Sequence, residues 1–333
     1  MSQTPPPALI VGHGKSGTTL VQALLDSHPQ LAVFPLEPYV FGRLVLPTLG
    51  KSAEDRRAHA TTFLRKLHEH PLGWLAEIPF DELDTTYRRH VEAAGGDYRA
   101  YHAGLVLAWA ELTGIDTSRL RRWVEKTPEY EKYADYVFAQ WPDARMLHVM
   151  RDPRDNFGSY KRFRIKHHPH RRAVAADSFA RRWRESERLA RRNLTRFGSR
   201  YRILRYEDLV HDPATRLGEL ADFFGIDLDP ALEQPTLAGR PWGGNSMHGE
   251  RFTGIDTSSV GRWRSTLDEA TVTALEARLA TPMRRLGYEL TTRPSLTVHG
   301  RAWLDNGTDQ LRALWHRLRP TPPRRVLTHP DSA

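Results

Sequence analysis

The sequence predicts an α/β protein whose central parallel sheet has about five strands and is covered by helices on both faces. Short apolar segments alternate with longer amphipathic ones along most of the 333 residues, and this alternation is typical of a parallel sheet with crossover helices. A glycine-rich turn at 12–17 joins the first apolar segment to the first amphipathic one. Basic or aromatic residues follow several apolar segments directly, and ligands bind at that edge of such sheets.

The strands are expected where compact apolar runs occur, at 8–11, 31–34, 122–125, 145–150 and 201–205. The helices are expected from residue 18 to about 28, and at 129–140, 177–197, 214–224 and 267–286. A mostly helical region at 52–114 interrupts the alternation, and 98–112 is its clearest helix. These elements predict one domain at 8–290, after a disordered start at 1–7 and before a basic tail at 291–333.

Composition excludes several classes of site. The chain has no cysteine, so disulfides, thiolate zinc sites and a cysteine nucleophile are excluded. Lysine and arginine number 49 against 40 acidic residues, giving a formal charge of +9, which favours anionic partners without choosing among them. No apolar run approaches the ~20 residues that cross a bilayer, and the first residues lack a signal-peptide pattern. A cytoplasmic location is therefore expected.

The central motif is the segment Gly12–Thr19, GHGKSGTT, between the first strand and the first helix. Backbone N–H groups and the helix dipole favour a phosphate at such a junction. Lys15 adds a positive charge, and further donors come from the hydroxyls of Ser16, Thr18 and Thr19. A Walker A loop needs a glycine five residues before its Gly-Lys pair, and Leu9 occupies that place. The loop therefore suits one phosphate and is too short to wrap a triphosphate.

This loop resembles the 5′-phosphosulfate loop of sulfotransferases that use 3′-phosphoadenosine 5′-phosphosulfate (PAPS). The resemblance implies a P-loop-like, three-layer αβα fold with PAPS as co-substrate and no metal. It also implies that the donor's phosphosulfate is bound by Gly14, Lys15, Ser16, Gly17, Thr18 and Thr19.

A second family signature is an arginine after a central strand with a serine eight residues later, here Arg151 and Ser159. The resemblance implies that this pair holds the 3′-phosphate, a task suited to a guanidinium fork and a hydroxyl. Three further segments resemble the family. The Lys-x-Pro segment implies that Lys126 is a second cation near the transferred group, and the Tyr-Glu-Asp segment implies that Tyr206 lies near the adenine. The late segment implies that Arg262, Trp263 and Arg264 close over the nucleotide.

The implied reaction is in-line transfer of a sulfuryl group to a hydroxyl, which needs a charge stabiliser and a base. Lys15 is the expected stabiliser, and Lys126 shares that role. Glu37, in the segment Leu36–Phe41, resembles the glutamate of the glycosaminoglycan and tyrosylprotein branches, and it is expected to be the base. The alternative is that Glu37 is a surface carboxylate in an entry loop. Ser246 is carried over from the tyrosylprotein branch as a contact of the sulfuryl region.

Histidines are the rivals of Glu37 as the base. His13 lies in the phosphate loop, where it would contact nucleotide or solvent, and His102 lies on a helix as a packed residue. The stretch at 160–172 is expected to be a basic loop, either solvated or a rim that faces a polyanion or a membrane. The spacing of its histidines at 167, 168 and 170 does not fit a zinc site.

The acceptor is not identified by any motif. A sugar, a phenol, a peptide tyrosine, a lipid headgroup or a small metabolite would each offer a hydroxyl, and the region 52–114 is expected to shape the pocket. The tail includes an amphipathic segment at 303–318, which is either a packed appendage or a contact for a membrane surface or partner.

Two other functions compete with sulfuryl transfer. A kinase or NTPase on the same scaffold would need magnesium, but the shortened loop and the Arg151–Ser159 pair argue against it. A non-catalytic binder of polyanions or nucleic acid would use the +9 charge and show steep salt dependence, but it leaves the phosphate loop unexplained. A nucleic-acid partner is therefore not expected.

Overall fold

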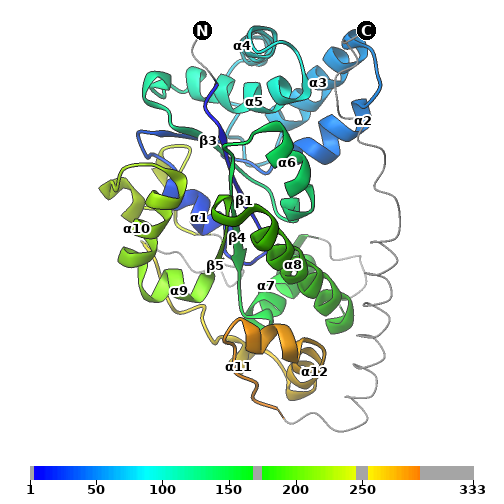
Figure 1. Cartoon of the computed structure of the whole chain (residues 1–333), viewed down its shortest axis with the longest axis vertical. Coiled ribbons are helices and arrows are strands. Elements are labelled where there is room, and N and C mark those ends of the chain that lie inside the picture. The colour runs from blue at the N-terminus through cyan, green and yellow to red at the C-terminus, as the bar shows by residue number, and fades with distance from the viewer. Residues whose placement is uncertain (1–3, 168–174, 245–253, 293–333) are drawn as a thin grey trace.

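The computed structural model describes residues 4–167, 175–244 and 254–292, and a five-stranded parallel sheet runs through them (Figure 1). The strand order is β2-β3-β1-β4-β5. The strands are β1 (Pro7–Val11), β2 (Leu31–Val33), β3 (Arg122–Lys126), β4 (Arg145–Met150) and β5 (Tyr201–Arg205). All five expected strands and their parallel pairing are confirmed.

Alternate residues of β1 explain how the sheet forms the middle layer. Successive side chains of a strand face opposite sides, so Leu9 and Val11 pack in one hydrophobic cluster while Ala8 and Ile10 pack in the other. Because both faces are buried, β1 is apolar at every position from 8 to 11. The sequence therefore shows a continuous apolar run in place of a polar alternation.

Helices cover both faces, as Figure 1 shows with α1, α9 and α10 on one side of the strands and α6 and α8 on the other. The first group is α1 (Thr18–Leu25), α9 (Tyr206–His211) and α10 (Pro213–Phe224). The others are α3 (Ala53–His68), α4 (Phe80–Ala93), α5 (Tyr98–Leu112), α6 (Ala134–Gln140), α7 (Pro153–His167), α8 (Ala176–Phe197), α11 (Trp263–Thr266) and α12 (Glu269–Arg285). This is the expected three-layer αβα arrangement.

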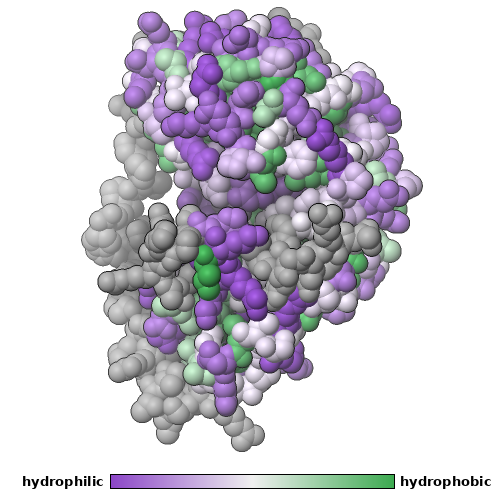
Figure 2. Space-filling view, turned by 180° about the vertical axis from the view of Figure 1, so that it is seen from behind, coloured by the Kyte–Doolittle hydropathy of each residue, from purple (hydrophilic) through white to green (hydrophobic). Residues whose placement is uncertain are grey.

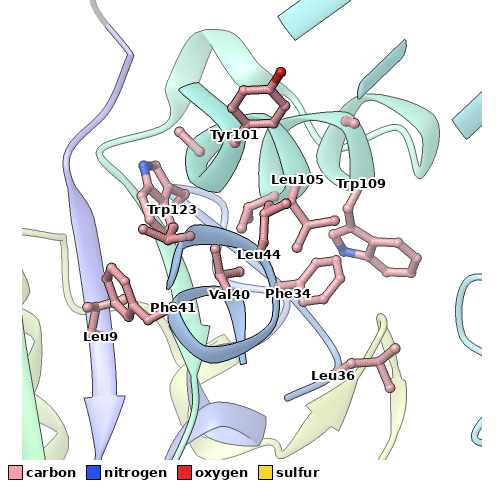
Figure 3. Close-up of a cluster of buried hydrophobic side chains, with 14 of the residues drawn as sticks. Leu9, Phe34, Leu36, Val40, Phe41, Leu44, Tyr101, Leu105, Trp109 and Trp123 are labelled. Atoms are coloured by element: carbon pink, nitrogen blue, oxygen red, sulfur yellow. The ribbon is translucent and has the colours of Figure 1, made fainter. Parts of the chain in front are cut away.

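The region 52–114 is helical as expected, and it packs on the segment that follows β2. Figure 3 shows Phe34, Val40 and Leu44 of that segment against Leu105 and Trp109 of α5. The Phe34 and Trp109 rings meet edge to face, with centroids 6.4 Å apart. A π-helical turn at Phe41–Val45 and the short α2 (Leu46–Thr48) lead into α3. The 34–45 segment is thus held by the core at both ends.

One prediction about local structure is wrong. The basic stretch at 160–172 was expected to be a loop, but α7 continues through it to His167. No glycine or proline occurs between Gly158 and Pro169, so nothing in the chain stops the helix there. Residues 168–172 lie outside the described part of the chain, as do two of the three histidines there, His168 and His170.

Smaller differences concern element ends and one missed hairpin. The predicted helix at 129–140 begins as a 3₁₀ turn, Tyr130–Tyr133, before α6. The short β6 (Thr236–Leu237) and β7 (Arg240–Pro241) pair antiparallel; runs of two residues carry no periodic signal. The tail's predicted helix at 303–318 lies outside the described residues, and the bounds of the domain stay a prediction.

Hydrophilic residues dominate the surface seen in Figure 2, with hydrophobic ones scattered among them. Within the described ranges, no helix combines the length and apolar character needed to cross a membrane.

Candidate active site

The glycine-rich loop between β1 and α1 has the backbone conformation that an anion site needs. Gly12 and Gly17 adopt φ values of +137° and +101°, which L side chains rarely tolerate. Lys15 also has a positive φ of 68°, and such left-handed residues turn consecutive N–H groups toward one concave side. A Cβ at Gly12 would lie 2.4 Å from the Val149 carbonyl oxygen. Only glycine therefore fits at this crossing.

Two buried polar atoms at the loop fit an anionic ligand. Among the described residues, Ser16 Oγ and Arg151 Nε are shielded from solvent and have no hydrogen-bond partner. Buried polar groups are normally paired, and both of these atoms are donors to phosphate. The residues present thus fit the nucleotide that the sequence motifs imply.

Arg151 joins three segments that are far apart in the chain. It begins the turn after β4, and its Nη2 donates to the Ser259 carbonyl oxygen at 2.9 Å. Its guanidinium lies over the Tyr206 ring, 4.6 Å from the centroid, and the Tyr206 hydroxyl lies 2.7 Å from Ser259 Oγ. Gly17 brings the loop against the same ring, where an added Cβ would be 2.4 Å from Tyr206 Cδ2. Arg151, Tyr206 and the loop therefore lie together, and their role in binding the nucleotide stays a prediction.

The first turn of α7 connects the glycine-rich loop to the late motif at 261–264. The sequence did not predict this connection. Asn156 Nδ2 donates to the Gly14 carbonyl oxygen at 2.9 Å. Asp155 accepts the backbone N–H groups of Gly261 and Trp263, each at 2.7 Å. In the sequence, Asp155 and Asn156 follow an Asp-Pro pair, which is typical of a turn. Their contacts could be predicted only if a helix were known to begin at Pro153. Ser159 is half-buried on the same helix.

The late motif is anchored by packing. Trp263 is 6% exposed. The guanidinium groups of Arg154 and Arg264 each lie over its ring, 4.1 and 4.5 Å from the centroid. Arg154 is held in turn by Asp152 at 2.6 Å and Glu276 at 2.5 Å. Arg262 Nε donates to the Ser258 carbonyl oxygen at 3.2 Å. A role of this motif over the nucleotide stays a prediction, and Ser246 lies outside the described residues.

Glu37 and Lys126 form an ion pair beside the loop. Lys126 is the last residue of β3, and its Nζ also lies 3.3 Å from Thr19 Oγ1 of α1. Its side chain is 4% exposed while that of Glu37 is 35% exposed, so the carboxylate remains open to solvent. Tyr39 donates its hydroxyl to the second Glu37 oxygen at 2.9 Å. The structure thus brings the expected base and the second expected cation together.

The charges in this cluster shift each other's pKa values. Burial lowers the pKa of Lys15 to about 8, and the nearby cations Lys126, Arg151 and Lys166 act in the same direction while Glu37 opposes them. Burial would raise the pKa of Glu37, but the Lys126 charge and its hydrogen bond outweigh burial and hold that pKa below its ordinary value. Glu37 is therefore ionised at neutral pH, as a base must be.

The two rival histidines are both packed. His13 contacts the rings of Tyr160 and Phe179, with centroid distances of 5.4 and 4.9 Å, and burial lowers its pKa. His102 is paired with Glu125 and packed against Trp123. Sequence analysis missed the His102–Glu125 pair, because it depends on α5 lying over β3. In the described ranges no cluster of three histidine or acidic residues is placed to hold a metal ion.

A phosphate-type loop after β1, a guanidinium after β4 and an aromatic ring after β5 meet at the carboxyl edge of a parallel sheet, and this combination defines a nucleotide-binding α/β protein. The model of the sulfotransferase family matches residues 6–230. The chain belongs to the sulfotransferase family.

Named relatives are similar over a part of the chain. Mouse carbohydrate sulfotransferase 5 is 34% identical over 99 residues, which are 27% of this chain and 23% of the relative. Human carbohydrate sulfotransferase 2 is 33% identical over 95 residues, which are 28% and 18%. The matches therefore span less than a quarter of these curated relatives.

Two solved structures share the fold. The sulfotransferase domain from the curacin biosynthetic pathway has a TM-score of 0.53 and 21% identity, and the match covers 87% of this chain and all of that domain. The sulfotransferase domain of the Synechococcus PCC 7002 olefin synthase has a TM-score of 0.52 and 23% identity, with coverage of 87% and 98%.

Proposed function

We propose that this protein transfers the sulfuryl group of PAPS to a hydroxyl group of an acceptor. The observation that carries the proposal is the meeting of Lys15, Lys126 and Glu37 beside an anion-binding loop. In the reaction the acceptor oxygen forms a bond to sulfur while the bond from sulfur to the phosphate oxygen breaks. The bonding electron pair stays with the phosphate of adenosine 3′,5′-bisphosphate (PAP), and the acceptor proton passes to a base.

The donor would be held at the carboxyl edge of the sheet. The loop amides and the hydroxyls of Ser16, Thr18 and Thr19 would bind the phosphosulfate. Arg151 and Ser159 would bind the 3′-phosphate, and Tyr206 would lie near the adenine. The unpartnered Ser16 Oγ and Arg151 Nε support this assignment. Arg262, Trp263 and Arg264 would close over the nucleotide. Ser246 would contact the sulfuryl region.

Lys15 and Lys126 would stabilise the charge that develops on the leaving oxygen. Such preorganised charges act strongly where water is excluded, and Lys126 is almost fully buried. Lys15 remains mostly protonated at neutral pH, because its pKa of about 8 lies above that pH. An anionic donor bound beside it would raise this pKa further.

Glu37 would be the general base. It is ionised, half-buried and held next to both lysines, so an acceptor oxygen beside it would also lie beside the transferred group. Leu36 and Val40 are fully buried on either side, which fixes the backbone that carries the carboxylate. The histidine alternatives are weaker because both rings are packed against aromatic side chains.

The acceptor belongs to the class of hydroxyl compounds, and a sugar hydroxyl is the first candidate because the curated relatives are named carbohydrate sulfotransferases. The Glu37 segment leads directly into the helices of 52–114, which supports a role for these helices in shaping the acceptor pocket. A cytoplasmic location and a membrane or partner contact of the tail stay predictions.

The test is sulfuryl transfer itself. Purified protein is incubated with PAPS carrying labelled sulfur and with separate pools of sugars, phenols, tyrosine peptides, lipids and small metabolites. Label appearing on one pool, with PAP formed in equal amount and without added magnesium, supports the proposal. Label that never leaves PAPS, together with hydrolysis of magnesium–ATP, would favour the NTPase alternative.

A further inference from the structure

Tyr39 and Lys126 bind different oxygens of one carboxylate. The Tyr39 hydroxyl donates to Oε2 of Glu37 at 2.9 Å, and Lys126 Nζ pairs with Oε1. Two donors from separate elements therefore define the plane of the Glu37 carboxylate. A carboxylate offers about four lone-pair sites, so lone pairs remain for the proton of an acceptor.

The Tyr39 ring is itself fixed from several directions. The Arg43 guanidinium lies over it, 4.8 Å from the centroid, and the Tyr130 ring meets it edge-on at 6.2 Å. The Tyr130 hydroxyl accepts the Phe41 backbone N–H at 2.8 Å, which fastens the next turn of the chain. The position of the hydroxyl beside Glu37 is therefore set by packing.

The backbone at Tyr39 is strained. Its φ of 54° is an outlier for a bulky residue, and a π-helical turn follows directly at Phe41–Val45. Strained residues persist only where their surroundings hold them, and both features concentrate at functional sites. The strain places an aromatic hydroxyl within reach of a carboxylate only two residues earlier in the chain.

We infer that Tyr39 is a positioning residue, whose hydroxyl holds the Glu37 carboxylate in the orientation that accepts the acceptor's proton. This inference rests on the proposed role of Glu37 as the base. Tyr39 remains a donor throughout the working range, because burial and the Glu37 charge raise the pKa of its hydroxyl.

The charged groups around Glu37 and Tyr39 determine the midpoints that a pH profile of turnover measures. Glu37 faces Lys126 of β3 and Lys15 of the loop. The charges of Glu129 and Arg43 act on the pKa of Tyr39. The charges of Arg43 and Glu37 act on the pKa of His70. Deleting the Tyr39 hydroxyl removes none of these charges. It does remove the Tyr39 hydrogen bond, which helps to lower the pKa of Glu37.

The experiment compares Tyr39→Phe with wild type and with a matched control, Tyr201→Phe. The control also deletes one hydroxyl, which bonds His148 at 2.7 Å. Tyr201 begins β5, which lies at the edge of the sheet opposite β2. PAPS turnover is measured across pH with the best acceptor found, or with water as acceptor. The expected result is a kcat at the pH plateau about tenfold to a hundredfold lower, the scale of one hydrogen bond to a charged group. The KM for PAPS should stay unchanged, and the acidic limb should move to higher pH.

The kcat plateau of Tyr39→Phe distinguishes two roles of Tyr39: orienting the Glu37 carboxylate, or only stabilising its negative charge. If Tyr39 only tuned the charge of Glu37, the more basic carboxylate would give an equal or higher plateau, and that result would overturn the inference. An unmoved acidic limb would overturn it as well. If Glu37→Gln is inactive while Tyr39→Phe behaves as wild type, only the inference about Tyr39 fails.

A second readout needs no turnover. The infrared carboxylate band of Glu37 is identified as the signal lost in Glu37→Gln, and its titration is followed in PAP-loaded protein. Its midpoint should rise in Tyr39→Phe and not in Tyr201→Phe, while equal midpoints would contradict the contact. Wild type that leaves PAPS intact under all conditions would instead refute the proposed function.

Discussion

Lys126 and Glu37 form an ion pair across 89 residues of sequence. The pair exists because β2 pairs with β3 in the sheet, so that the segment after β2, which carries Glu37, begins next to the end of β3. A buried cation is thereby placed beside both a solvent-accessible carboxylate and the anion-binding loop.

Changing Glu37 to Gln should lower turnover by about 10²–10⁴, the scale of losing a general base. The shape of the amide is similar, so PAP affinity should change little by calorimetry. Wild-type activity should fall at acidic pH as Glu37 is protonated, with its midpoint below the ordinary glutamate pKa because Lys126 stabilises the ionised form. A His13→Asn variant is the comparison. Full activity of Glu37→Gln with an inactive His13→Asn would show that the base is assigned wrongly.

Changing Lys15 to Ala should lower turnover by roughly 10²–10³, the scale of one preorganised charge stabiliser. The control is Lys51→Ala, an exposed lysine away from the loop. The free protein's Lys15 loses its proton as pH rises through about 8, and a bound anion favours the protonated form. PAP affinity of wild type should therefore fall above that pH, and the fall should be absent in Lys15→Ala. A near-wild-type rate for Lys15→Ala would remove this residue from the mechanism.

Changing Arg151 to Ala should weaken PAP binding by about tenfold to a hundredfold, which corresponds to one charge-assisted hydrogen bond or more. Arg151→Lys should recover only part of the affinity, because an ammonium lacks the guanidinium fork and its stacking on Tyr206. Arg121→Ala, at an exposed arginine, controls for net charge. Unchanged calorimetric affinity of Arg151→Ala would contradict its proposed contact with the 3′-phosphate.

Changing Gly17 to Ala should destabilise the loop and weaken PAP binding. The new Cβ would lie 2.4 Å from the Tyr206 ring at a φ of +101°, and strain of this kind costs about 1–3 kcal/mol. Gly50→Ala is the matched control, since Gly50 also has a positive φ of +74° but no atom within 4 Å of an added Cβ. Thermal unfolding should show a larger loss for Gly17→Ala. Equal losses would mean that contact with Tyr206 does not matter.

Much of this site could be predicted because its signals are local. The strand, loop and helix around Lys15 lie in one short segment, and Arg151 directly follows a strand, so each could be placed at the carboxyl edge of a parallel sheet. The apolar runs of the five strands also marked the sheet. Only the residues within each run were needed for these inferences.

The remaining contacts depend on tertiary packing. Asn156 reaches Gly14 and Asp155 reaches Trp263 only because α7 begins directly after β4, and no spacing in the sequence reveals either contact. Tyr39 beside Glu37 requires a left-handed backbone at an aromatic residue, which propensities disfavour. The continuation of α7 to His167 differs from the expected basic loop, because lysine and arginine are good helix formers and no glycine or proline occurs at 159–167.

The central claim is that the loop and Arg151 bind a nucleotide that carries both a 5′- and a 3′-phosphate. Calorimetric titration of the purified protein with PAP, and separately with magnesium–ATP, tests it most directly. We expect PAP to bind at one site without metal and far more tightly than magnesium–ATP. Tight binding of magnesium–ATP with no heat from PAP would contradict the account.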